Sequence, residues 1–322
     1  MQYRNVGKYG VKVSEIALGS WLTYGGATEV DIAEKCIDAA YELGVNFFDT
    51  ANVYARGHAE TVVGKALSKF PRESLFVATK VFFPMGDGPN DRGLSRKHIF
   101  EQCHVSLKRL GMDYIDLYQT HRFDLSTPLE ETLLALDDLA RQGKILYAGV
   151  SEWSASQIAQ ATELIRTSNW HPIISNQPYY NMLGRWVEDE VIPLCENEGI
   201  GQVVFSPLAQ GVLTGKYKPG DPPAPGTRAA DPNQNMFMGN RGAMDQKQLE
   251  GVQRLVPIAK DAGLTMPQLA LAWCLRQKNV SSVITGASRP QQVEANVSAS
   301  GITLSPDLLA KIDEALGVSA DD

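Results

Sequence analysis

Short apolar segments alternate with longer segments of helical period along almost the whole 322-residue chain. Eight of the short segments are rich in the aliphatic and aromatic residues typical of buried strands. They read EIALGS, NFFDTA, LFVATKV, IDLYQTH, ILYAGVS, IISNQPY, QVVFSP and SSVITGA. Between them, residues 95–110 have a helical pattern in which Ser95 is the expected cap and Ile99 and Cys103 share an apolar face. Eight strand–helix repeats predict an α/β fold, a parallel sheet closed into a (β/α)₈ TIM barrel.

The alternative to a closed barrel is a doubly wound open sheet. Such a sheet binds a dinucleotide at a GxGxxG turn that follows its first strand. The corresponding turn in this chain, LGSWLTYGG at residues 18–26, does not have that pattern. The barrel is therefore favoured. Because barrels of this kind commonly reach about 250 residues or more, we predict a single domain spanning residues 1–322.

Two segments fall outside the repeat. Residues 3–14, YRNVGKYGVKVS, alternate around a Lys-Tyr-Gly turn and predict an N-terminal β-hairpin that covers one end of the barrel. Residues 218–245, after the seventh strand, are rich in Pro and Gly and have no apolar period. So long an irregular connection is usually either a functional lid or a disordered insert. We predict a lid.

Composition excludes several classes of protein. No run of about eighteen apolar residues is present, so membrane insertion is not expected. A net charge of -7 gives no basic surface for nucleic acid. The start MQYRNVGKYG lacks the apolar core of a signal peptide, and the cysteines form no CxxC pair, which favours a cytoplasmic protein with reduced thiols. The five histidines show no HExxH spacing, and no metal site is predicted. The four cysteines are Cys36, Cys103, Cys195 and Cys274.

Three neighbouring strands end on ionisable residues. Asp49 ends the second strand, Lys80 the third and His121 the fourth, and Tyr54 follows Asp49 by five residues. A lone lysine or histidine at a strand end is more often structural. In a barrel, however, the carboxyl ends of all strands meet at one mouth, where reactive side chains gather. We therefore predict that these four side chains form one catalytic site.

The four side chains together can act as a proton donor. A tyrosine has an ordinary pKa of about 10, so it needs a nearby cation to stabilise the phenolate that proton transfer leaves behind. Lys80 can provide that cation, and the carboxylate of Asp49 favours the charged form of the lysine. A neutral His121 can donate a hydrogen bond to a carbonyl oxygen. This chemistry fits carbonyl reduction, which also requires a hydride donor.

Longer motifs carry a resemblance to a known family. The chain resembles the aldo-keto reductases, and is similar to their branch of potassium-channel β subunits and bacterial reductase relatives. The resemblance implies NADP(H)-dependent reduction of aldehydes or ketones by the tetrad Asp49, Tyr54, Lys80 and His121. Some channel subunits have asparagine in place of the histidine, so His121 favours a working enzyme. The motifs are YRNVGKYGVKVSEIALG, FFDTANVY, GLSRKHI, SLKRLGMDYIDLY, TPLEET, NQPYYNML, FSPLAQGVLTGKY and SSVITGAS.

The resemblance also implies a set of NADP(H) contacts. Ser151 and Gln177 match the pair that holds the nicotinamide carboxamide, and Phe205 the ring that stacks on the nicotinamide. Glu152 and Ala295 depart from the family pattern, where Asn or Arg and an acidic residue are common. For Gln292 and Asn296, the alternative reading is a solvated helix face. The pyrophosphate is assigned to Ser206, Leu208, Gly211 and Lys216, the adenosine and its 2'-phosphate to Ser288, Arg289, Gln292 and Asn296, and further contacts to Ser20, Trp21, Pro207, Arg228 and Gly286.

The substrate site is expected to be aromatic. An aromatic pocket suits uncharged aldehydes and ketones, whereas Arg122 and Arg56 would steer an acidic or phosphorylated aldehyde, and both alternatives remain open. The candidates that follow predicted strand ends are Tyr24, Phe82, Phe83 and Trp153 as substrate contacts, with Trp21 and Tyr180 nearby.

A second function from a different class is also consistent with the resemblance. The barrel would bind NADP(H), turn over slowly and pass its redox state to a partner such as a channel. A homo-oligomer is possible under this hypothesis. A metal-dependent barrel hydrolase is a weaker third hypothesis, since the sequence offers no metal-ligand spacing.

Overall fold

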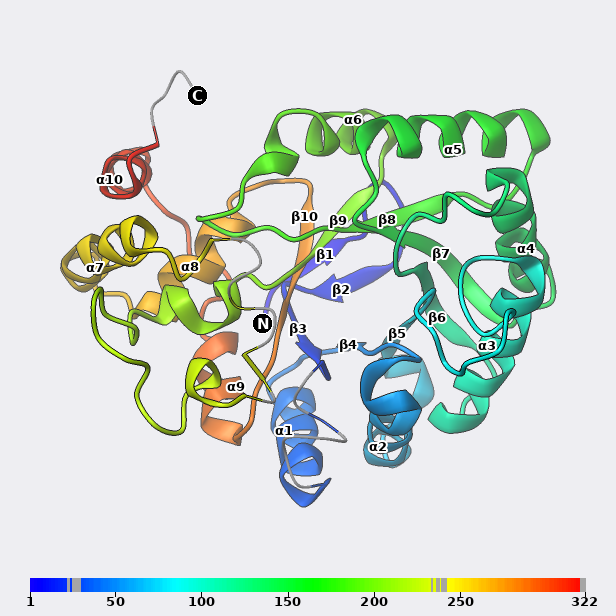
Figure 1. Ribbon diagram of the computed structural model, residues 1–322, viewed down its shortest axis with the longest axis horizontal. Helices are drawn as coiled ribbons and strands as arrows, with labels where there is room; N and C mark the ends of the chain where they lie inside the picture. The colour runs from blue at the N-terminus through cyan, green and yellow to red at the C-terminus, as the bar shows by residue number, and fades with distance from the viewer. Residues whose placement is uncertain (22–23, 25–29, 233, 236–237, 239–241, 319–322) are drawn as a thin grey trace.

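The computed structural model describes residues 1–21, 24, 30–232, 234–235, 238 and 242–318. Eight parallel strands close into a barrel in the order β10-β3-β4-β5-β6-β7-β8-β9 (Figure 1). They are β3 (Ile16–Gly19), β4 (Phe47–Asp49), β5 (Phe76–Val81), β6 (Ile115–Thr120), β7 (Ile145–Ser151), β8 (Ile173–Gln177), β9 (Gly201–Phe205) and β10 (Val280–Thr285). Each strand coincides with one of the eight predicted segments, and only β9 and β10 begin one residue earlier. The predicted (β/α)₈ barrel is confirmed.

Helices follow the strands and surround the barrel (Figure 1). The predicted helix at residues 95–110 is α3, whose first turn is capped by the Ser95 hydroxyl accepting from the His98 amide. No helix in the described part of the chain is long and apolar enough to cross a membrane. The helices are α1 (Val30–Glu42), α2 (His58–Leu67), α3 (Arg96–Leu110), α4 (Leu129–Arg141), α5 (Ala155–Ser168), α6 (Val191–Glu198), α7 (Gln246–Asp261), α8 (Met266–Leu275), α9 (Pro290–Val297) and α10 (Pro306–Leu316), with short 3₁₀ helices η1 (Tyr54–Gly57), η2 (Arg72–Ser74), η3 (Trp186–Glu188), η4 (Ala209–Thr214) and η5 (Arg228–Ala230).

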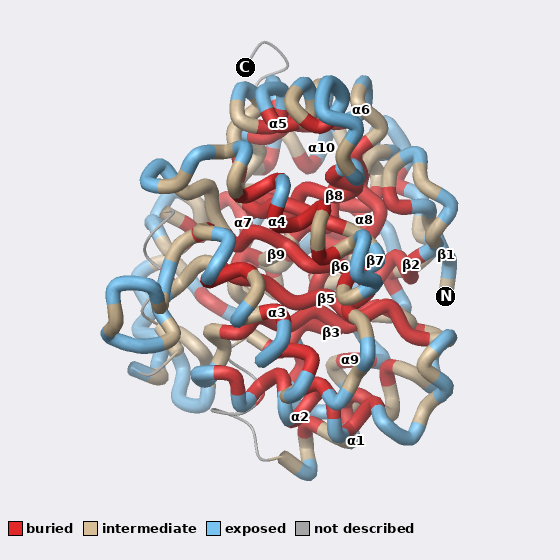
Figure 2. The backbone as a smooth tube through the Cα atoms, turned by 90° about the vertical axis from the view of Figure 1, so that its right-hand side faces the viewer, coloured by how far each residue is buried: buried red, intermediate tan, exposed pale blue. Residues whose placement is uncertain are grey.

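The N-terminal hairpin closes one end of the barrel. Strands β1 (Tyr3–Asn5) and β2 (Lys12–Ser14) pair antiparallel, which confirms the predicted hairpin. Val6 and Val13 are fully buried in the same apolar cluster as Phe47 and Phe76 of the barrel strands. Figure 2 shows that most of the barrel strands are buried while exposed residues lie mainly on the outer helices and loops. With the amino ends of the strands covered, the carboxyl ends are left to form a site.

The segment 218–245 connects β9 and the following η4 to α7, which confirms a long connection after the seventh barrel strand. Its described part contains the single helical turn η5 and no strand. None of the residues 218–232 is buried. This stretch therefore has little apolar packing of its own to fix its position.

Candidate active site

A cleft of about 1900 Å³ opens at the carboxyl ends of the barrel strands. Asp49, Tyr54 and His121 line it from β4, β6 and the loops that follow them. Described residues of the segment 218–245, among them Arg228, also line it. Pockets for drug-sized ligands are usually about 300–1000 Å³. The larger cleft can therefore hold a ligand of dinucleotide size together with a small substrate.

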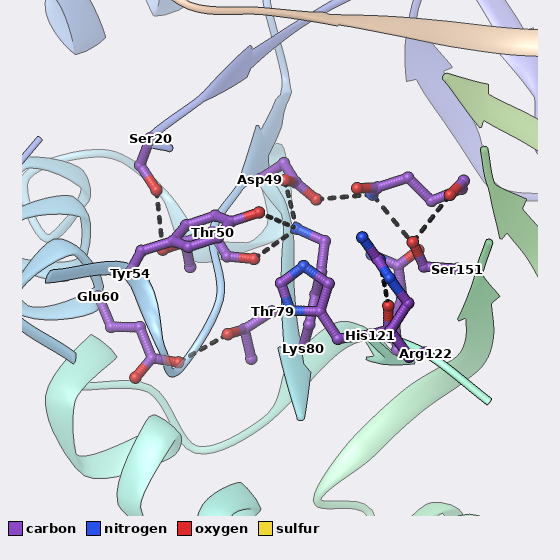
Figure 3. Close-up of polar contacts among 12 residues, drawn as sticks. Ser20, Asp49, Thr50, Tyr54, Glu60, Thr79, Lys80, His121, Arg122 and Ser151 are labelled. Atoms are coloured by element: carbon purple, nitrogen blue, oxygen red, sulfur yellow. Dashed lines mark hydrogen bonds and ion pairs between the residues drawn. The ribbon is translucent and has the colours of Figure 1, made fainter. Parts of the chain in front are cut away.

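Lys80 lies at the centre of the predicted tetrad (Figure 3). Its side chain is fully buried, and its Nζ lies 2.5 Å from Asp49 Oδ1 and 2.7 Å from the Thr50 carbonyl oxygen. The same Nζ is 3.5 Å from the Tyr54 hydroxyl. On the other side, Asp49 Oδ2 accepts a hydrogen bond from Gln177 Nε2 at 3.0 Å. The ammonium group of Lys80 is thus held beside the phenol of Tyr54 by the carboxylate of Asp49, each of whose oxygens accepts a hydrogen bond.

Burial, with a smaller contribution from Asp49, keeps Tyr54 protonated. Burial raises the pKa of Tyr54 well above its ordinary value, the Asp49 carboxylate adds to the increase, and the Arg122 charge opposes it. Burial also lowers the pKa of Lys80, while Asp49 opposes that decrease. For Tyr54, burial and the Asp49 carboxylate outweigh the opposing charge of Arg122. The phenol therefore holds its proton at neutral pH and is available as a donor.

His121 is held neutral beside the phenol. Burial lowers its pKa well below the ordinary value, and the positive charges of Lys80 and Arg122 lower it further. Its ring lies edge-to-face on Tyr54, with centroids 5.7 Å apart, and on Phe83, at 4.9 Å. Its Nδ1 is buried and has no hydrogen-bond partner among the described residues. A neutral imidazole carries one N–H donor, which is what polarising a carbonyl oxygen requires.

Ser151 and Gln177 lie side by side on β7 and β8. The Ser151 hydroxyl donates to the Gln177 carbonyl oxygen at 2.8 Å. Gln177 Nε2 also approaches Gln119 Oε1 at 3.5 Å, although Gln119 was not among the predicted site residues. Gln119 precedes His121 by two residues, and this spacing, which places both on one face of a strand, could have pointed to it. Hydrogen bonds thus connect Asp49 of the tetrad to Gln177 and Ser151, the predicted carboxamide pair.

Strained backbone marks the loops around the cleft. Of the seven described non-glycine residues with positive φ, six follow β4, β7 or β9. Such conformations cluster at functional sites because the surrounding structure must hold them in place. Glu152, with φ of 58°, is one of them, and its Oε1 accepts from the Tyr179 amide at 2.6 Å. The six are Ala55, Arg56, Glu152, Ser206, Ala209 and Gln210.

Two cations lie where the predicted pyrophosphate contacts gather. Gly211 has φ of 96°, and a Cβ built on it would lie 3.2 Å from Lys216 Nζ, so glycine leaves room beside that charge. Burial lowers the pKa of Arg228, and among the described residues no carboxylate pairs with it. A partly buried cation without a carboxylate suits a phosphate ligand. The lining residues in this region are Phe205, Ser206, Pro207, Leu208, Gly211, Lys216 and Arg228.

The predicted adenosine contacts lie after β10 and on α9. The Ser288 amide donates to Gln292 Oε1 at 2.8 Å, which joins the two residues at the start of the helix. Arg289 is exposed at the N-cap of α9 and lies outside the cleft lining. The residues that do line this region are Gly286, Ser288, Gln292, Ala295 and Asn296.

Several predicted contacts lie elsewhere in the structure. Trp153 is fully buried against Phe123, with ring centroids 4.8 Å apart, because the chain turns at Glu152. Phe82 packs against Phe83 outside the cleft lining, so only Phe83 reaches the cleft. We therefore leave Trp153 and Phe82 out of the substrate site.

The remaining predicted residues differ in their access to the cleft. Trp21 and Tyr24 line it, although Tyr24 is almost completely buried. Ser20 is buried and donates to the Thr50 hydroxyl at 2.8 Å, so its contact with a ligand would be indirect. Tyr180 is fully buried, and Arg56 is exposed and outside the lining. Sequence reasoning missed Tyr179, Thr214 and Asp231, which line the cleft just after β8, at the end of η4 and in the segment 218–245. Within the described part of the chain, no three potential metal-ligating His, Cys, Asp or Glu residues gather.

Comparison with known proteins decides the family. The Aldo/keto reductase family model matches residues 15–316. The chain belongs to the aldo/keto reductase family. Members of this family are oxidoreductases, and the family supports carbonyl reduction in general.

Curated relatives within the aldo/keto reductase family carry channel-subunit names. A probable voltage-gated potassium channel subunit beta of Arabidopsis thaliana is 45% identical over 321 residues, which cover 98% of this chain and 97% of the relative. A protein of the same description from Oryza sativa subsp. japonica is 43% identical, with 97% and 96% covered. A putative voltage-gated potassium channel subunit beta of Schizosaccharomyces pombe is 42% identical, with 98% and 93% covered. The resemblance to this branch is confirmed.

Proposed function

We propose that this chain reduces aldehydes or ketones to alcohols with NADPH and takes the proton from Tyr54. The observation that carries the proposal is the tetrad: the Tyr54 hydroxyl lies 3.5 Å from Lys80 Nζ, which in turn is 2.5 Å from Asp49. Neutral His121 packs against the same phenol. When bound, NADPH supplies the hydride that the carbonyl carbon accepts.

The chain's own residues supply the proton and hold the carbonyl group. His121 donates a hydrogen bond to the carbonyl oxygen and orients it toward Tyr54. The phenol then gives its proton to that oxygen as negative charge develops. Lys80 stabilises the phenolate that forms, and Asp49 keeps Lys80 charged in its buried position. Each group is buried or half-buried, so water does not need to be reorganised during the proton transfer.

The cleft has donors that suit the parts of the proposed cofactor. Ser151 and Gln177 would hold the carboxamide, with Phe205 against the nicotinamide ring. Lys216 and Arg228 would hold the pyrophosphate, and the supporting observation is that no described carboxylate pairs with Arg228. The 2'-phosphate is assigned to Ser288 and Arg289 at the start of α9, where the helix dipole favours anions.

A kinetic panel tests the proposal. The purified protein should oxidise NADPH when simple aldehydes and ketones are added, with alcohol formed in equal amount. NADH should support lower rates at equal concentration. Failure of every carbonyl in a broad panel to promote NADPH oxidation would contradict the proposal.

The names of the relatives favour a second candidate function. We propose as an alternative that the chain is a cytoplasmic NADP(H)-sensing subunit that regulates a partner such as a channel, as a homo-oligomer. Three relatives named as potassium channel β subunits support this alternative. Under it, the protein should bind NADPH with micromolar or tighter affinity and oxidise it at a negligible rate. Rapid turnover of simple aldehydes would make reduction the main role.

A further inference from the structure

Gln119 is a fully buried amide beside the lysine of the tetrad. It lies on β6, where it pairs in register with Lys80 of β5 and with Gly149 of β7. Leu117, two residues earlier and therefore on the same face of the strand, packs in the apolar cluster inside the barrel. Gln119 is 0% exposed and is not part of the cleft lining. It can therefore act on a bound ligand only through another residue.

Packing and hydrogen bonding both hold the Gln119 side chain in place. A Cβ built on Gly149 would lie 3.1 Å from Gln119 Cγ and 2.4 Å from Ser175 Oγ, so glycine leaves the room that these side chains occupy. Among the described residues, the Gln119 side chain has one hydrogen-bond partner, Gln177, whose Nε2 donates to Gln119 Oε1 at 3.5 Å. An apolar side chain of similar size would fill this space without needing a partner. The amide at this position therefore points to a role through Gln177.

The side-chain amide of Gln177 meets acceptors on its nitrogen side. Its Nε2 donates to Asp49 Oδ2 at 3.0 Å and to Gln119 Oε1. Its Oε1 accepts no hydrogen bond from the described residues, and Gln177 lines the cleft. In Figure 3 these contacts lie between the labelled Asp49 and Ser151. Turning the amide over would place Oε1 against two other oxygens, which repel it, so the two acceptors keep the amide in its present orientation.

We propose that Gln119 is a positioning residue for the cofactor: together with Asp49 it orients the Gln177 amide so that Oε1 accepts a hydrogen bond from the carboxamide NH₂ of the nicotinamide. The proposal rests on the NADP(H) binding proposed above and deepens it. Gln119 itself touches neither cofactor nor substrate. Because Gln119 and Lys80 pair in register, the strands that hold the catalytic ammonium group also hold the group that aligns the nicotinamide.

The test compares two nucleotides that differ only in the group that Gln177 would recognise. They are NADP⁺ and its 3-acetylpyridine analogue, in which a methyl ketone replaces the carboxamide. The analogue keeps the oxygen but has no N–H to donate. Calorimetric titration measures both affinities without turnover. Wild type should bind NADP⁺ roughly twofold to tenfold more tightly than the analogue, which corresponds to the net contribution of one uncharged hydrogen bond.

Substitutions of Gln119 should change this preference. Gln119→Met removes the acceptor, so the ratio of the two affinities should fall toward one while the affinity for the analogue stays near that of wild type. Gln119→Asn withdraws the oxygen by one methylene group and is a second variant with the same expectation. Gln119→Glu keeps an oxygen at this position and should retain most of the preference.

Gln202→Met is the matched control. Gln202 is also a fully buried glutamine on a barrel strand, its Oε1 accepts a hydrogen bond from Asn176 Nδ2 at 3.0 Å, and it lies outside the cleft lining. The substitution removes a comparable hydrogen bond away from Gln177. This variant should keep the wild-type ratio of affinities.

Three outcomes overturn the proposal and leave NADPH-dependent reduction standing. If wild type binds NADP⁺ and the analogue equally, Gln177 does not accept from the carboxamide. If Gln119→Met and Gln119→Asn keep the wild-type ratio, Gln119 does not position Gln177. If Gln202→Met loses the preference to the same extent, the loss reflects a weakened barrel. Failure of wild type to bind either nucleotide would instead contradict the proposed function, and this inference would fail with it.

Discussion

At the catalytic end of the cleft most functional side chains come from strand ends, whereas the proposed contacts with the cofactor phosphates and adenosine lie on the connections that follow β9 and β10. Lys80 and Asp49 are buried and bonded to each other, and Asp49 also accepts a hydrogen bond from Gln177 on β8. Lys216 and Arg289 are exposed, and residues 218–232 contain no buried side chain. The difference suggests that the chemistry depends on rigid placement, while the cofactor contacts can form when the ligand binds.

Removing the Lys80 ammonium group should have the largest effect, a loss of stability at the catalytic end. Lys80→Met leaves the Asp49 carboxylate, which is 4% exposed, buried without its positive partner. Breaking a buried ion pair in this way typically costs about 3–5 kcal/mol of the free energy of unfolding. Urea unfolding measures the loss. Lys65→Met is the matched control, because Lys65 pairs with Glu34 on the surface, and it should leave stability unchanged. Equal stability of both variants would show that the pair is not important for the fold.

The next effect separates chemistry from cofactor binding. Tyr54→Phe keeps the ring that packs against His121 but removes the hydroxyl group that would donate the proton. We expect kcat to fall by about 100-fold or more, in line with loss of a general acid, while NADPH affinity stays near wild type. Tyr41→Phe, which removes a hydroxyl that bonds to Ser74 outside the cleft, should leave the rate unchanged. A Tyr54→Phe enzyme with near-normal turnover would remove Tyr54 from the mechanism.

A smaller effect is expected at the cofactor end. Arg289 is exposed beside Ser288, so its contact with a 2'-phosphate would be partly screened by water. Arg289→Ala should weaken NADPH binding about tenfold or more and leave NADH binding unchanged, since NADH has no phosphate there. Fluorescence titration of both cofactors at fixed salt measures the two affinities. Equal losses for both cofactors would contradict the assignment.

The burial of His121 should also appear in the pH dependence of stability. Its pKa is well below the ordinary 6.5 in the folded state, so as pH falls below about 6.5 the unfolded chain binds a proton that the folded chain does not. The free energy of unfolding should therefore decrease with falling pH, by up to about 1.4 kcal/mol per pH unit.

His121→Asn should flatten this decrease between pH 6.5 and pH 5. Exposed His104→Asn is the control, and its unfolding curves should follow wild type. Parallel curves for wild type and His121→Asn would mean that His121 is not buried as a neutral group.

The same contrast between the two ends explains which residues the sequence could predict. Asp49, Lys80 and His121 could be predicted from the sequence because strands have a regular period and recognisable ends. The barrel then brings the carboxyl ends of its strands together. Trp153 was misplaced because the positive φ at Glu152 redirects the chain, and nothing in the residue type Glu predicts that conformation. Asp231 was missed because an irregular segment has no period from which its direction could be read.

The smallest expected effect concerns the segment 218–245. Its described residues line the cleft, and residues 218–232 have no buried side chain, so contacts with cofactor phosphates through Arg228 would be a main source of order. NADPH should therefore slow thermolysin cleavage between residues 218 and 245 by a few-fold. Arg228→Ala should remove most of this protection, because its partly buried guanidinium has no carboxylate partner among the described residues. Lys247→Ala, which removes an exposed charge on α7 outside the cleft lining, should keep it. Cleavage at the same rate with and without NADPH would mean that the segment is not a lid, and the contrast between a rigid catalytic end and a ligand-ordered cofactor end would no longer hold.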